Sequence, residues 1–176
     1  MRFFRILLFI LFCAKTIPVF AVGFDFTYPI IASDPDDLKG FRTAMTYQPK
    51  SLAWGRSHLY FNGSFGHWWR TEASNNHHVN IVALAPVFRY YFANTTTISP
   101  FGEISVGPAY LSRTRLGTYN LGMHFAFQDI LGLGFTVGAK KHFSFTLMAM
   151  HYSNGSLCNH NRGMSLPLAL NLGYRF

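Results

Sequence analysis

A histidine and a serine lie two residues apart near the end of an apolar segment late in the chain. They are His151 and Ser153 of the stretch "MAMHYSNG". In an extended strand the side chains of residues i and i+2 leave the same face, so this imidazole and this hydroxyl can approach hydrogen-bond distance. Such a pair is the minimum for a serine nucleophile activated by a neighbouring base. The spacing therefore indicates the chemistry of a serine hydrolase.

The two residues that follow the serine suit the stabilisation of a negatively charged oxygen. Asn154 offers a side-chain amide, and Gly155 leaves its backbone N–H accessible. Donors of this kind stabilise the oxyanion that forms when a nucleophile attacks an ester carbonyl. A His-x-Ser spacing alone is more often a pair of interfacial polar residues at a strand end. The asparagine and the glycine favour a catalytic site instead.

The face that carries this pair is otherwise apolar. His151 and Ser153 alternate in phase with Phe143, Phe145 and Leu147 of the same segment. If that face meets lipid, the pair meets lipid too. Polar side chains are unfavourable on a lipid-facing wall, and least so near the membrane interface. A function is one reason to retain them there.

The composition indicates that lipid surrounds part of the protein. Aromatic residues make up 18% of the chain and charged residues only 12%, whereas a soluble domain carries roughly 25% charged residues. After the N-terminal leader, no stretch reaches the about 18 consecutive apolar residues that a membrane helix needs. A closed β-barrel is the other structure that satisfies every backbone polar group in lipid. The sequence therefore predicts an all-β transmembrane barrel.

The first residues have the form of a secretory signal peptide. Two arginines precede an apolar run, and Val19 and Ala21 fit the small residues of a cleavage site. We therefore expect residues 1–21 to be a signal peptide and residues 22–176 to form the barrel domain.

The charge of the mature chain suits a membrane surface better than a nucleic acid. Of the 15 basic residues three lie in the leader, so 12 remain against 7 acidic residues, a formal net charge of +5. A mild positive charge favours an anionic membrane surface. The basic residues are scattered and the chain is exported, which argues against a nucleic-acid partner. Only Cys158 remains after cleavage, so no internal disulfide can form.

The last segment, "GMSLPLALNLGYRF", alternates in the way expected of a barrel strand, because strand side chains point to opposite faces in turn. One face would be apolar and would hold Met164, Leu166, Leu168, Leu170, Leu172, Tyr174 and Phe176. The other would be small or polar and would hold Gly163, Ser165, Pro167, Ala169, Asn171, Gly173 and Arg175. The terminal phenylalanine, with an aromatic residue two positions earlier, is also similar to the ending of bacterial outer-membrane barrels.

Nine segments fit barrel strands, whereas bacterial barrels close with an even number. The candidates are 22–31, 41–47, 57–65, 80–92, 101–112, 119–127, 131–139, 141–153 and 163–176. We expect eight strands: either the first segment does not span, or 119–139 is a single bulged strand. Trp54, Trp68, Trp69 and residues 89–92 are expected to supply interfacial girdles.

The ends of the chain set the orientation. In outer-membrane barrels both termini lie in the periplasm and the periplasmic turns are short. The last strand then begins outside, and the loop 154–162 is extracellular. His151 and Ser153 are therefore expected near the outer leaflet.

Three late motifs resemble the lipid A 3-O-deacylases of Gram-negative outer membranes. They are "HYSNG" at 151–155, "NHNRG" at 159–163 and the final "YRF". The stretches "FGEISVGPAYLS" and "FAFQDILGLGFTVG" are similar to that family's middle segments. The resemblance covers about residues 98–176.

The resemblance implies an eight-stranded antiparallel barrel in the outer membrane, with a serine-hydrolase site on its outer wall. It implies hydrolysis of the ester-linked acyl chain at position 3 of lipid A. By position, Ser153 would be the nucleophile, His151 the base, and Asn154 with Gly155 the oxyanion donors. The partners would be lipid A or lipopolysaccharide in the outer leaflet and the outer-membrane insertion machinery. No metal or cofactor is implied.

The chain departs from the family at one position. The family has a glutamate about a dozen residues after the serine, whereas this chain has no acid after Asp129. Ser165 or Asn161 would orient His151 through a neutral hydrogen bond. Alternatively, another strand would supply the missing acid as Asp129 or Glu103, although Glu103 is expected to point inward. A barrel that binds lipopolysaccharide without catalysis, or another lipid-directed barrel enzyme, is the alternative interpretation.

Overall fold

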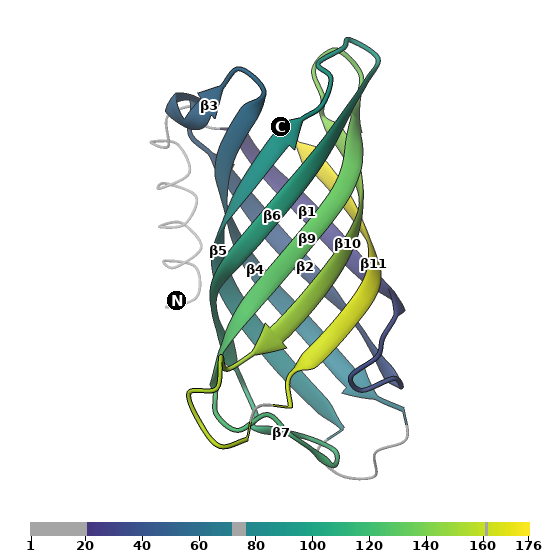
Figure 1. The fold of residues 1–176 in the computed structure, drawn as a ribbon. Coiled ribbons are helices and arrows are strands. Elements are labelled where there is room, and N and C mark those ends of the chain that lie inside the picture. Colours follow the sequence, from purple (N-terminus) through teal and green to yellow (C-terminus); the bar gives the residue numbers. More distant parts are fainter. Residues whose placement is uncertain (1–20, 72–76, 161) are drawn as a thin grey trace, which may run out of the picture.

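The computed structural model describes residues 21–71, 77–160 and 162–176, which form a closed antiparallel barrel (Figure 1). Its eight long strands are β1 (Ala21–Ile31), β2 (Leu38–Gln48), β4 (Ser57–Arg70), β5 (His78–Tyr91), β6 (Ile98–Leu111), β9 (Phe125–Val137), β10 (Phe143–Ser153) and β11 (Met164–Arg175). The connections contain the 3-10 helix η1 (Lys50–Leu52) and the short strands β3 (Ala53–Trp54), β7 (Arg115–Leu116) and β8 (Tyr119–Asn120). Among the described residues, no helix has the length and apolar character needed to cross a membrane. The expected signal peptide, apart from Ala21, and Asn161 lie outside the described residues.

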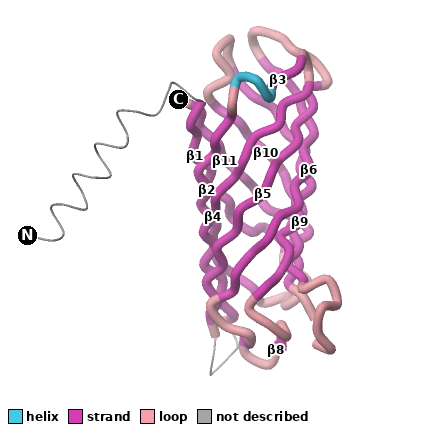
Figure 2. The backbone as a smooth tube through the Cα atoms, turned by 90° about the vertical axis from the view of Figure 1, so that its left-hand side faces the viewer, coloured by secondary structure: helices cyan, strands magenta, loops and turns pink. Residues whose placement is uncertain are grey.

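Each long strand is hydrogen-bonded to a neighbour on both sides, so the sheet closes on itself (Figure 2). β1 pairs with both β2 and β11, and β2 also pairs with β4. Because these eight strands form a closed sheet, none of them presents an edge of unpaired backbone N–H and C=O groups to lipid. The predicted eight-stranded antiparallel barrel is confirmed.

Strand β9 settles the count of candidate segments. It runs without interruption through 125–137 and keeps a regular register with β6 and β10. The region 119–139 therefore contributes one spanning strand, although this strand has no bulge. The start of that region forms β8, which pairs with β7 in the loop. β1 spans, contrary to the other possibility that the sequence left open.

The outer wall is apolar because side chains alternate between the inside and the outside of the barrel along each strand. Met45, Leu84 and Leu133 are each more than 60% exposed on this wall. A soluble monomer rarely exposes so continuous an apolar surface, whereas a transmembrane barrel presents such a band to lipid.

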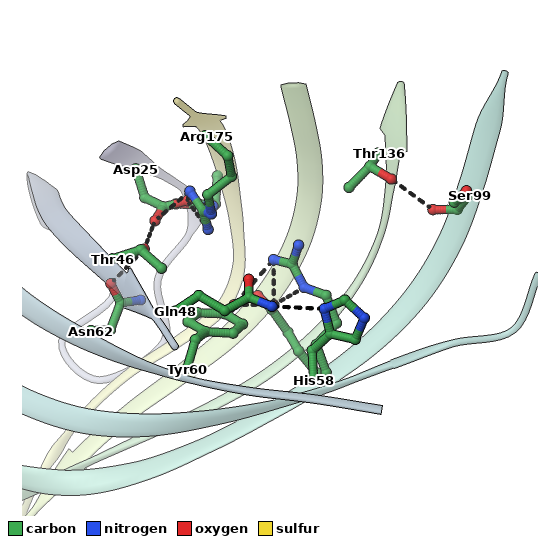
Figure 3. Close-up of polar contacts among 12 residues, drawn as sticks. Asp25, Thr46, Gln48, His58, Tyr60, Asn62, Ser99, Thr136 and Arg175 are labelled. Atoms are coloured by element: carbon green, nitrogen blue, oxygen red, sulfur yellow. Dashed lines mark hydrogen bonds and ion pairs between the residues drawn. The ribbon is translucent and has the colours of Figure 1, made fainter. Parts of the chain in front are cut away.

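One half of the barrel interior is held together by buried ion pairs (Figure 3). Arg175 lies 3.1 Å from Asp25, which also accepts a hydrogen bond of 2.7 Å from Thr46 Oγ1. Arg89 and Glu103 are both buried, and Arg89 Nη2 lies 2.7 Å from the carboxylate. Buried charges are tolerated only when they are paired, so these contacts allow polar residues to line the interior.

The other half of the interior is apolar and closely packed. The residues that are at most 2% exposed there include Trp68, Val79, Ile81, Leu111, Tyr152, Met164 and Leu166.

The polar part of the interior leaves little free space. Among Asp25, Arg42 and Tyr60 a cavity of only about 10 Å³ remains. An eight-stranded barrel has an interior that side chains can fill. This inner cavity, formed by described residues, is too small for a lipid chain.

Three residues expected in interfacial girdles, Trp68, Arg89 and Tyr91, face inward instead and are at most 5% exposed. Trp68 is fully buried and packs against Tyr152, with 6.5 Å between the ring centroids. Arg89 is held inside by its ion pair. The cause is the two-residue period of a strand, because the adjacent Trp68 and Trp69 cannot share a face. Trp54 is exposed, as expected.

The two ends of the barrel differ in their connections. β1 begins and β11 ends at the same end, the upper one in Figure 1, where β9 and β10 are joined by the short segment 138–142. The opposite end carries the longer segments 112–124 and 154–163. Long loops of outer-membrane barrels are extracellular, so the end of β10 that carries His151 lies on the outer side.

Substitution of Arg89 tests the interior ion pair. The change Arg89→Ala leaves the buried Glu103 carboxylate without its positively charged partner, so we expect the free energy of unfolding to fall by about 3–5 kcal/mol. The temperature at which the folded band disappears from cold-loaded denaturing gels measures the effect. The double variant Arg89→Met/Glu103→Leu should stay much closer to the native chain, because it removes both charges. Equal stability of Arg89→Ala and the native chain would contradict this account.

Candidate active site

His151 and Ser153 lie at the outer end of β10, and both are half-buried on the outer face of the wall. Between them Tyr152 points inward and is 2% exposed. Its hydroxyl donates a hydrogen bond of 3.0 Å to Gln128 Oε1, and its ring packs on Trp68. This anchor fixes the strand end, so the outward pair is presented from a rigid part of the barrel.

A β-bulge in β11 decides where Ser165 points. Met148 pairs with Ala169, but Met150 pairs with Leu166, so β11 has one residue more than β10 over this stretch. β1 has a matching irregularity on the other side of β11, between Pro29 and Ile31. A bulge adds one unpaired residue and re-aims the side chains beyond it.

The strict alternation predicted for the last segment is therefore wrong beyond the bulge. Met164 and Leu166 turn into the barrel and are 1% and 0% exposed, whereas Ser165 and Pro167 face outward. The proline offers a physical reason, because it has no N–H to donate to the strand ladder and is tolerated mainly at edges and bulges. As a result, Ser165 shares the outer face with His151.

The imidazole of His151 is held by Ser165. The Nδ1 atom lies 2.9 Å from Ser165 Oγ, and the two residues face each other in the β10–β11 register. If Nδ1 carries the hydrogen and donates it to Ser165, Nε2 is left as the proton acceptor. This is the tautomer that a base needs in order to take a proton from a serine.

The backbone of Ser165 is itself fixed by the segment between β1 and β2. The N–H of Ser165 donates to the carbonyl oxygen of Asp34 at 2.8 Å, and the N–H of Ser33 donates to the carbonyl oxygen of Ser165 at 3.1 Å. The residue that orients the histidine is thus held on both sides, by β10 and by this loop.

Ser153 lies beside the imidazole without a hydrogen bond to it in this structure. Its neighbour across the β9–β10 register is Phe127, whose ring packs edge-on against that of Phe125 at 5.1 Å. Serine–histidine hydrogen bonds of hydrolases are often long before substrate is bound. The two side chains share the outer face of β10 and lie two residues apart, and the approach of the hydroxyl to Nε2 stays a prediction.

Gly163 makes room for the histidine ring. Its φ is +68°, and a Cβ at this position would lie 3.0 Å from His151 Cε1 and 3.0 Å from the carbonyl oxygen of Tyr152. Only glycine adopts this backbone conformation without strain and also leaves that space empty. The sequence motif that ends in this glycine therefore has a steric function at the site.

The two expected oxyanion donors occupy different environments. Gly155 is exposed, with φ of +63°, at the start of a turn in which Leu157 N–H donates to the carbonyl oxygen of Asn154. The Asn154 side chain is 1% exposed, and its Nδ2 donates to the carbonyl oxygens of Leu121 and His160. The amide of Asn154 therefore holds the loop, whereas Gly155 is on the accessible side, and the use of either residue as an oxyanion donor stays a prediction.

A groove of about 540 Å³ runs along the outer wall beside the histidine. Its polar side chains include Asp129, His151 and Ser165, and its apolar lining includes Ile104, Val106, Leu131, Ala149 and Pro167. A smaller groove of about 220 Å³ shares Ile104 and Leu131 with it and continues along β6 and β9. Apolar grooves with a few converging polar groups are typical of binding sites.

Two other features, the acid Glu103 and a second groove, are less suitable for a catalytic site. Glu103 faces inward, as expected, and is bound to Arg89. A larger groove of about 800 Å³ covers parts of β2, β4, β5 and β6, but no histidine, cysteine or acid lines it. The described residues include no cluster of three or more histidine, cysteine or acidic side chains that could hold a metal ion.

The fold and this site define an outer-membrane β-barrel with a serine and a histidine on its lipid-facing wall. The chain matches the family model described as Lipid A 3-O-deacylase (PagL) over residues 39–175. This match spans well over half of the sequence, so the chain belongs to the lipid A 3-O-deacylase (PagL) family. The resemblance inferred from the late motifs is thereby confirmed.

Two curated relatives agree with this family assignment. The chain is 34% identical over 110 residues to Lipid A deacylase PagL of Pseudomonas aeruginosa, covering 62% of this chain and 61% of that protein. It is 27% identical over 123 residues to Lipid A deacylase PagL of Bordetella bronchiseptica, covering 70% and 65%. The matched region therefore spans less than two thirds of the length of these curated relatives.

Two solved structures resemble the barrel. The crystal structure of the outer membrane enzyme PagL superposes with a TM-score of 0.69 at 26% identity, covering 86% of this chain and 98% of that chain. Neisserial surface protein A (NspA) superposes with a TM-score of 0.58 at 14% identity, covering 89% and 97%. The second likeness shows the fold alone.

Substitution of Gly163 tests the geometry of the histidine. The change Gly163→Ala places a methyl group against the imidazole, so we expect Ser153 to react about tenfold more slowly, or slower still, with a lipophilic fluorophosphonate. Mass spectrometry of the labelled protein measures the rate. Gly55→Ala is the matched control, because Gly55 also has a positive φ of +59° but nothing lies within 4 Å of its added Cβ. Equal labelling rates of the two variants would rule out the steric role.

Proposed function

We propose that the protein is an outer-membrane serine esterase that hydrolyses the 3-O-linked acyl chain of lipid A. The observation that carries the proposal is the 2.9 Å contact between His151 Nδ1 and Ser165 Oγ on the outer wall, with Ser153 on the same face. When Nδ1 donates its hydrogen to Ser165, Nε2 is left without a hydrogen and acts as the base that a serine nucleophile requires. Membership of the lipid A 3-O-deacylase family supports the substrate.

The reaction follows from the position of each group. Ser153 Oγ attacks the ester carbonyl while His151 Nε2 takes the hydroxyl proton. The Gly155 N–H donates a hydrogen bond to the oxyanion of the tetrahedral intermediate. His151 then returns the proton to the departing 3-oxygen of the sugar, and the acyl group stays on Ser153. A water molecule, deprotonated by His151, releases the fatty acid and restores the serine.

Asn154 has a supporting function in this scheme. Its amide ties the loop to the carbonyl oxygens of Leu121 and His160, and Cys158 Sγ lies 3.1 Å from the same nitrogen. These contacts set the backbone that leads into Gly155. We infer that the asparagine positions the oxyanion donor rather than serving as one.

The outward grooves suit the acyl chain of such a substrate. The groove beside His151 and its continuation past Ile104 and Leu131 are lined mainly by apolar side chains. The acyl chains of lipid A are already in an apolar layer, so close packing of the chain in the groove, and not its transfer from water, favours binding there. In the outer leaflet, lipid A lies alongside the wall and does not need to leave the membrane in order to bind.

Substitution of the nucleophile tests the function. Ser153→Ala should leave a folded barrel but lower the rate of fatty-acid release at least about 10⁴-fold, because no other hydroxyl replaces the attacking oxygen. Mass spectrometry of lipid A from expressing cells measures the loss of the 3-linked chain. Unchanged lipid A in cells that express the native chain would leave lipopolysaccharide binding without catalysis as the better interpretation.

Substitution of Ser165 tests how the histidine is oriented. Ser165→Ala removes a neutral hydrogen bond, so we expect kcat to fall by up to about tenfold with little change in KM. Ser57→Ala, near the other end of the barrel, serves as a control with an equivalent loss of a hydroxyl. Native kcat in Ser165→Ala would show that the 2.9 Å contact does not contribute to catalysis.

A further inference from the structure

The proposed reaction creates a charge that Ser165 cannot balance. When His151 takes the serine proton, the imidazole becomes a cation beside an apolar wall. Serine hydrolases ordinarily stabilise this cation with a buried carboxylate that contacts the ring. Ser165 is neutral, so it fixes the orientation of the ring without supplying a negative charge. A nearby acid is therefore the missing component of the site.

The strand on the other side of β10 supplies such an acid. Asp129 of β9 is the register partner of His151, just as Ser165 is its partner on β11. Residues directly opposite in an antiparallel pair have Cβ atoms about 4.5–5.5 Å apart. Asp129 is half-buried on the outer face and lines the same groove as the histidine.

The surroundings of Asp129 leave His151 as its natural counter-ion. Its register partner on β6 is Val106, which is apolar. No described residue forms a hydrogen bond or an ion pair with the Asp129 carboxylate, whereas Asp25 and Glu103 in the same barrel are paired with Arg175 and Arg89. A carboxylate on a lipid-facing wall is unfavourable without compensation.

We propose that Asp129 supplies the negative charge that stabilises protonated His151. In this arrangement the two functions of the usual acid are divided between neighbouring strands. Ser165, on β11, orients the ring through Nδ1. Asp129, on β9, lowers the energy of the imidazolium through its charge. The inference rests on the proposed esterase function, and Asp129 acts through His151 as a positioning and charge-balancing residue.

The division of the two functions between Ser165 and Asp129 predicts the effect of a second substitution. In Asp129→Asn the charge is lost while the shape is kept, so kcat should fall about 10- to 100-fold with KM nearly unchanged. Asp129→Glu should keep most of the activity. Adding Ser165→Glu or Ser165→Asp to Asp129→Asn should recover at least a tenfold part of the loss, because the acid then contacts the same ring from β11.

The experiment measures kcat and KM for release of the 3-linked acyl chain from purified lipid A in mixed micelles, with each variant first shown to be folded by its gel mobility. Asp36→Asn, an exposed acid in the loop after β1, is the matched control and should leave kcat unchanged. Native kcat in Asp129→Asn overturns the inference. A loss that neither acidic residue at position 165 restores also overturns it, because a merely structural defect would behave in that way.

The failure of the broader proposal gives a different pattern. A native chain that releases no fatty acid, or a Ser153→Ala variant that remains active, contradicts the esterase function itself. A native chain that is active and depends on Ser153, but not on Asp129, contradicts only the assignment of the charge.

Discussion

The site depends on a single extra residue in β11. In a closed barrel every side chain must point either inward or to the lipid, and the period of two leaves no intermediate choice. The bulge near Pro167 reverses which of the residues before it face inward and which face outward. Because of it, Leu166 fills the apolar interior while Ser165 meets the histidine. Without it, the serine would face the interior and a leucine would lie beside the imidazole.

The rest of the barrel acts to keep that arrangement rigid. Tyr152 anchors the strand end from the inside, and the loop after β1 holds both sides of the Ser165 backbone. The segment that follows Ser153 packs closely against the neighbouring loop, where a Cβ on Gly122 would lie only 2.0 Å from the carbonyl oxygen of His160. Supporting contacts of this kind hold catalytic groups in position.

Much of this structure could be predicted from the sequence, and the errors have separate physical causes. Alternating segments and composition are sufficient for the barrel, and the spacing of His151 and Ser153 places both on the outer face. The outward Ser165 depends on the register of β11, which a single bulge changes and which no local pattern reports, whereas the inward Trp68 follows from its alternation with Trp69. The sequence offers Asp129 as an available acid, but its position opposite His151 follows only from strand pairing. The Asn154 amide is engaged by a loop distant in sequence, which spacing cannot reveal.

The filled interior also determines how the protein meets its surroundings. Since the side chains of the described residues fill the core, lipid approaches the proposed site in two dimensions, by lateral diffusion within one leaflet. Encounter frequency is then set by how many lipids occupy each unit of membrane area and by how freely they move. A neighbouring protein that covered the face formed by β9, β10 and β11 would close the site as completely as an inhibitor.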